Sequence, residues 1–155
     1  MAEHELLQGV REIEHTADLG MEVEAASLEE LFQRAAAGMM ALVRATDHEA
    51  LDRPADESPT APALRSVRIE VDGDVPDVAA LLVRWLRELL YLQEVAGFVY
   101  QDDTFQRLDG SGLRASVRPD PDPSRQVREL KGVTYHGLEV EREADRWRAR
   151  VIFDI

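Results

Sequence analysis

The sequence closes on VIFDI, residues 151–155, with an aspartate in the last position but one. Side chains alternate between the two faces of a strand, so the odd-numbered residues from Trp147 to Ile155 are expected to face the core, while Asp154 points away from it. An anchored Ile155 would hold its own carboxylate or carbonyl close to Asp154. Adjacent negative groups repel unless a cation or a proton lies between them. Oxygen ligands of this kind suit a hard divalent cation such as calcium or magnesium.

Two such groups are too few for a closed site, so at least one more oxygen donor must come from elsewhere in the chain. The segment EHTADLG, residues 14–20, offers Asp18 in a connection between two strand-like stretches, with His15 close by. Each candidate also has an ordinary structural role. Asp18 could form a turn, His15 could bond a backbone carbonyl, and Asp154 could pair with a neighbouring arginine. The spacing alone leaves these alternatives open.

Lysine occurs once in the chain, at position 131, beside 17 arginines. A composition that otherwise uses arginine for positive charge indicates that Lys131 is there as a compact ammonium, because arginine presents a planar fork instead. Chance retention on a solvated strand is the plainer interpretation, and it stays open.

The charge balance bounds the choice of partners. The chain carries 31 acidic residues against 18 lysines and arginines, a formal net charge of −13. Tight binding to nucleic acid relies on a basic face, so an action on RNA would run through a partner protein. The alternative is that the excess acid only keeps the protein soluble.

Cysteine is absent, which excludes disulfides and thiolate metal sites. No membrane-length apolar run or secretory signal is visible, and we therefore expect a cytoplasmic protein.

Two helices are predicted to support these residues. The first runs through SLEELFQRAAAGMMALVRA, residues 27–45, where apolar side chains recur at helical spacing and Ser27 heads a capping box. The second lies within residues 74–97 and is expected to start at Asp74 or Asp77.

The rest of the pattern indicates strands and loops. Residues 19–26 and 67–71 alternate as half-buried strands do, and the last third of the chain reads as short strands separated by turns. Gly137 marks a tight turn or a bulge. Residues 46–63 contain three prolines and no periodicity, which predicts a loop. The economical architecture is one α+β domain over residues 1–155, with two helices packed on a mostly antiparallel mixed β-sheet.

Five segments, in order along nearly the whole chain, resemble the archease family. They are EHTADLG, SLEELFQRAAAGM, WLRELLYL, LKGVTYHGLEV and the closing VIFDI. The pairing of HTAD at one end with FDI at the other is the specific feature, because either motif alone is weak. The sequence is identified as a member of that family.

The resemblance implies a protein that is not itself an enzyme and that serves as a cofactor of an RtcB-type RNA ligase in tRNA splicing or RNA repair. That ligase joins a 2′,3′-cyclic phosphate or 3′-phosphate end to a 5′-hydroxyl, using GTP and manganese. The archease promotes guanylylation of the ligase and its repeated turnover. RNA is then contacted indirectly, if at all.

The resemblance also implies a divalent-metal site made by Asp18, Asp154 and the backbone of Ile155. Calcium is the first expectation, with magnesium, manganese or zinc as alternatives, and His15 is a further candidate at the site. Lys131 is expected to act with both aspartates in activating the partner.

Two other functions compete with this one. A broader chaperone or modulator of RNA-modifying enzymes, for instance a tRNA cytosine methyltransferase, would not need the metal site. An autonomous metal-dependent hydrolase could use His15, Asp18, His136 and Asp154. The sequence offers that hydrolase no zinc-protease helix motif, P-loop or serine-triad pattern.

Overall fold

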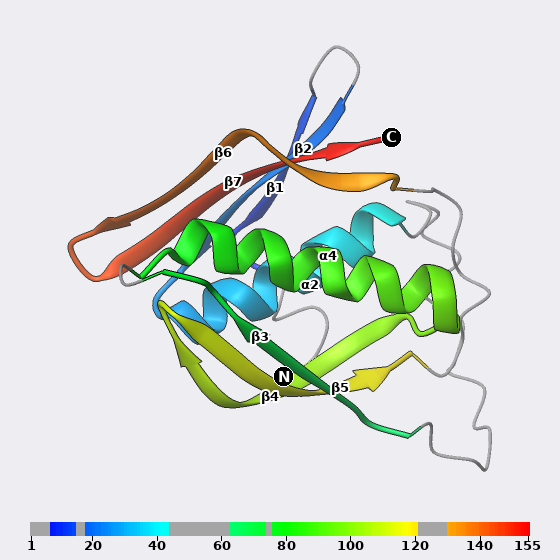
Figure 1. Ribbon diagram of the computed structural model, residues 1–155. Coiled ribbons are helices and arrows are strands. Elements are labelled where there is room, and N and C mark those ends of the chain that lie inside the picture. The colour runs from blue at the N-terminus through cyan, green and yellow to red at the C-terminus, as the bar shows by residue number, and fades with distance from the viewer. Residues whose placement is uncertain (1–6, 15–17, 44–62, 74–75, 121–129) are drawn as a thin grey trace.

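Two helices lie between two β-sheets in the part of the chain that the computed structural model describes (Figure 1). These described residues are 7–14, 18–43, 63–73, 76–120 and 130–155. The α+β class predicted from the sequence is confirmed. Most of the expected loop at 46–63 lies outside the described residues.

The beginning and the end of the chain meet in a four-stranded sheet. Its strands are β1 (Val10–Glu14), β2 (Asp18–Ala25), β6 (Gly132–Glu143) and β7 (Arg146–Asp154). They lie in the order β1-β2-β7-β6, and every neighbouring pair is antiparallel. The last strand is therefore central in this sheet, with β2 on one side and β6 on the other.

A second sheet of three strands covers the opposite side of the helices. It consists of β3 (Arg65–Glu70), β4 (Tyr100–Asp109) and β5 (Gly112–Pro119) in the order β3-β5-β4, again antiparallel. The single mixed sheet expected from the sequence is thus divided into two antiparallel sheets. Alternation tells which residues share a face of a strand, but it does not tell which strands pair.

The helix boundaries follow from their capping residues. Helix α2 (Leu28–Val43) opens where the Glu30 amide donates to Ser27 Oγ at 3.1 Å. Helix α4 (Val78–Ala96) opens at Asp77, whose carboxylate accepts from the Ala80 amide at 3.0 Å. It ends at Gly97, which has a φ of 63°. A left-handed residue is favoured at this position because it lets the last carbonyls of the helix bond back to the chain.

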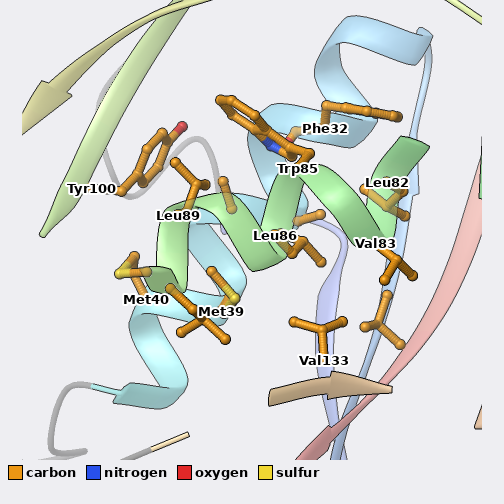
Figure 2. Close-up of a cluster of buried hydrophobic side chains, with 14 of the residues drawn as sticks. Phe32, Met39, Met40, Leu82, Val83, Trp85, Leu86, Leu89, Tyr100 and Val133 are labelled. Carbon is orange, nitrogen blue, oxygen red and sulfur yellow. The ribbon is translucent and has the colours of Figure 1, made fainter. Parts of the chain in front are cut away.

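The core lies where the helices contact each other and both sheets. Figure 2 shows Trp85 on α4 packed beside Phe32 on α2, and the indole Nε1 of Trp85 donates to the Phe32 carbonyl at 3.1 Å. The ring of Tyr100 meets that of Trp85 edge-on, with centroids 6.3 Å apart. Each large apolar side chain buried in this way stabilises the fold by about 1.5–3 kcal/mol. The helices therefore hold the two sheets in one body.

Strand β6 contains the bulge that Gly137 suggested. The register against β7 shifts between Thr134 and Glu139, and Gly137 adopts a φ of 71°. The two short strands expected around Gly137 are accordingly one strand, bent at an irregular position. This bend leaves the start of β6 to pair with the end of β7, where the candidate site lies.

Candidate functional site

The end of β7 brings together most of the residues singled out from the sequence. In the β2–β7 register Asp18 lies directly opposite Asp154. On the other side of β7, Gly132 is the register partner of Asp154, and the amide of Lys131 donates to the Asp154 carbonyl at 2.8 Å. Asp18 at the start of β2, Asp154 at the end of β7 and Lys131 just before β6 thus meet in one row, although 136 residues of sequence separate the two aspartates.

The outward face of this sheet otherwise places opposite charges side by side. Arg11 and Glu22 form an ion pair between β1 and β2. Further along, oppositely charged residues face each other in the register: Glu22 with Arg150, Glu24 with Arg148, Glu139 with Arg150, and Glu141 with Arg148. Opposite-charge neighbours stabilise a sheet and like charges oppose it. The pairing of Asp18 with Asp154 departs from this rule.

A groove of about 300 Å³ opens beside this row. Lys131, Gly132 and Asp154 line it from the sheet, and Tyr91 and Glu94 line it from α4. Both Lys131 and Asp154 are exposed. A cation and a carboxylate are therefore accessible from the same depression, next to an exposed aromatic ring.

The other predicted site residues have different outcomes. His15 lies outside the described residues. Ile155 was expected to face the core, but this is wrong: the residue is 49% exposed and follows the end of β7. Leaving the strand frees Ile155 from the alternation that buries Phe153. The backbone of Ile155 still adjoins Asp154, so its role as a ligand stays a prediction.

Possible metal ligands form no larger group within the described ranges. No three His, Cys, Asp or Glu side chains there lie close enough together to hold a metal ion. His136, part of the hydrolase hypothesis, is exposed on β6, and its amide bonds the hydroxyl of Thr134 at 3.0 Å. The metal site at Asp18 and Asp154 therefore stays a prediction from the sequence.

Arg87 on α4 is a site residue that the sequence analysis missed. Its Nε and one terminal nitrogen both donate to the Val133 carbonyl, at 3.0 and 2.9 Å. Its guanidinium also lies 4.9 Å from the centre of the Tyr135 ring. Arg87 lines the groove, yet in the sequence it looks like any exposed helix arginine. No local pattern could have revealed it, because its partners are more than 40 residues away.

A second cluster of titratable groups lies on β4 of the other sheet and on α2. Tyr100 donates to Oδ2 of Asp103 at 2.5 Å, and the amide of Gln33 donates to Oδ1 at 3.0 Å. Burial raises the pKa of Asp103 to about 6, because desolvation outweighs these two hydrogen bonds, which act to lower it. Burial also raises the pKa of Tyr100, and the charge of Asp103 adds to that effect.

Comparison with known proteins identifies the family of this chain. Residues 11–155 match the Archease protein family (MTH1598/TM1083). The protein archease of Methanopyrus kandleri is 34% identical over 150 residues, covering 93% of this chain and 97% of that protein. The chain belongs to the archease family. The protein archease of Pyrococcus furiosus is 30% identical over 149 residues, covering 92% of this chain and 95% of that protein.

Solved structures of the family share the fold. Protein 1598 of Methanobacterium thermoautotrophicum superposes with a TM-score of 0.69 at 26% identity, covering 95% of this chain and 99% of that one. An archease from Thermotoga maritima, described as a possible chaperone, superposes with a TM-score of 0.57 at 21% identity. That likeness covers 94% of this chain and 96% of the other. Within the described residues, no helix is long and apolar enough to cross a membrane.

Proposed function

We propose that this member of the archease family is a non-catalytic cofactor of an RtcB-type RNA ligase, and that it acts through the groove that holds Lys131 and Asp154. The proposal rests on family membership together with one observation. Asp18 lies opposite Asp154 at the point where the only lysine of the chain bonds the same residue. The partner is a GTP-dependent ligase, and the chain promotes its guanylylation and turnover.

The donor chemistry of this row suits a hard divalent cation. Asp18 and Asp154 are register partners in an antiparallel pair, and like charges at directly opposite positions repel. A calcium ion prefers carboxylate and carbonyl oxygens, and it would relieve that repulsion. Asp18, Asp154 and the backbone of Ile155 are the proposed ligands, with magnesium, manganese or zinc as alternatives. The bound cation would supply positive charge for stabilising phosphate groups.

The chain's own residues have separate tasks in this proposal. Asp154 presents its carboxylate to the groove while its carbonyl holds the amide of Lys131. The exposed ammonium of Lys131 is then available to an anionic group of the partner's substrates, since phosphoryl transfer depends on positioning and charge neutralisation. The net charge of −13 favours association with a basic, RNA-binding partner.

A multiple-turnover ligation assay tests the proposal. The cognate ligase, GTP and manganese are combined with the native protein, with Asp154→Asn, or with Asp72→Asn as the matched control. Asp72 is an exposed aspartate that follows β3, on the other sheet. We expect the native protein and Asp72→Asn to stimulate ligation equally. Asp154→Asn should stimulate it at least tenfold less than the native protein does.

Each other outcome has a defined meaning. Full stimulation by folded Asp154→Asn would keep the ligase as the partner and reject the site. No stimulation by the native protein would reject the ligase. A general chaperone role, such as action on a tRNA methyltransferase, would then be the function to test. That chaperone role gains support if activity toward the methyltransferase survives the loss of both Asp18 and Asp154.

A further inference from the structure

We infer that Arg87 is a positioning residue for the Lys131–Asp154 row, an inference that rests on the proposed function of that row. Arg87 belongs to α4, whereas Lys131 directly precedes β6 and Asp154 ends β7. Its side chain joins the helix to the first residues of β6. The following observations support this role.

The first observation is a forked hydrogen bond. Two nitrogens of the Arg87 guanidinium donate to the same carbonyl, that of Val133, at 3.0 and 2.9 Å. A planar guanidinium presents such a pair of donors in a fixed geometry, which a lysine ammonium cannot reproduce. Val133 is two residues after Lys131, so this contact fixes the main chain beside the single lysine.

The second observation is that Val133 is attached to α4 twice. Its side chain is buried and points toward α4 in the cluster that Figure 2 shows. Its carbonyl holds Arg87. With both groups engaged, the start of β6 has little freedom to slide or twist relative to the helix. This restraint also limits the motion of the Lys131 amide, which lies two residues before Val133 in the chain and donates to the Asp154 carbonyl.

The third observation concerns Tyr135. The Arg87 guanidinium lies 4.9 Å from the centre of its ring, within the range of a cation–π contact. Tyr135 is 52% exposed, so the arginine rather than core packing restrains this ring. Arg87 thus contacts two residues of the same short stretch of β6, Val133 and Tyr135, and of these Val133 lines the groove.

The chain offers a matched control three residues earlier on the same helix. Arg84 is also exposed, and its side chain also donates to a backbone carbonyl, that of Glu70 at the end of β3. Glu70 belongs to the other sheet and does not line the groove. Arg84→Lys therefore disturbs the same kind of contact without disturbing the proposed site.

Two measurements on Arg87→Lys and Arg84→Lys test the inference. The first is amide hydrogen exchange at Lys131, which reports local opening of the row and needs no ligase. We expect exchange at Lys131 to become at least tenfold faster in Arg87→Lys and to stay within twofold of the native rate in Arg84→Lys. Tyr135→Leu, a change at an exposed position, should accelerate it by a smaller factor.

The second measurement is the dependence of ligation rate on protein concentration. We expect Arg87→Lys to lower maximal stimulation several-fold with the half-saturating concentration unchanged, because docking is intact while the row is misplaced. Unchanged exchange at Lys131, or equal losses in the two arginine variants, would overturn the positioning role. A native protein that fails to stimulate would reject the proposed function, whereas the exchange data test Arg87 independently.

Discussion

Asp103 gives this protein a predictable dependence of stability on pH. Its carboxylate sits against Tyr100 and Gln33, and burial raises its pKa from 3.8 to about 6. Between these two values the folded state holds a proton that the unfolded state has released. Stability therefore falls as the pH rises through this window, because the unfolded state binds fewer protons. The loss of stability caused by the buried Asp103 carboxylate reaches its full size only above pH 6.

The size of the effect follows from the shift in pKa. A shift of roughly two units corresponds to about 3 kcal/mol at neutral pH, since one unit is worth 1.36 kcal/mol. Most of this difference, about 2 kcal/mol, should develop between pH 4 and pH 7. Asp103→Asn cannot ionise, so the variant should lack this slope and gain stability relative to the native protein as the pH rises.

Urea denaturation at several pH values, followed by tryptophan fluorescence, measures this difference. The quantity to plot is the free energy of unfolding of Asp103→Asn minus that of the native protein. Asp72→Asn serves as the control for losing one exposed aspartate. A difference that is flat between pH 4 and pH 7, or that changes with the opposite sign, would refute the argument from burial.

Two further predictions concern the site sheet. Calcium at a hundred times its dissociation constant should raise the unfolding free energy of the native protein by about 2.7 kcal/mol and should not change that of Asp154→Asn. Thermal unfolding with and without calcium measures this, and an equal rise of the unfolding temperature in both proteins would reject Asp154 as a ligand. Gly137→Ala should cost about 1–2 kcal/mol in urea denaturation, because its φ of 71° disfavours a side chain. The added Cβ would also meet Ile152 Cγ1 at 3.2 Å. Gly132→Ala is the control: its φ is not in the left-handed range and its Cβ would meet only Asp154 Oδ2, at 3.9 Å, so a similar cost there would contradict the backbone explanation.

Much of the local structure could be predicted from the sequence, because it depends on neighbours in the chain. The hydroxyl of Ser27 caps α2 as predicted, and of the two aspartates considered for the start of α4 it is Asp77 that caps the helix. Alternation along β7 correctly predicted that Val151 and Phe153 are buried and that Asp154 is exposed. It failed at Ile155 because that residue lies beyond the strand, where alternation no longer applies.

The sequence by itself determined the class of the fold, its helix starts and the residues worth watching, since spacing and residue type carry that information. Only the tertiary structure decided which strands pair. It placed Asp18 opposite Asp154 in the register, joined Lys131 to the same residue, and brought Arg87 to Val133. These contacts join segments that are far apart along the chain. They arise because β7 inserts between β2 and β6 while α4 packs against the start of β6. The residue pattern of a single segment does not specify which other segment it will contact.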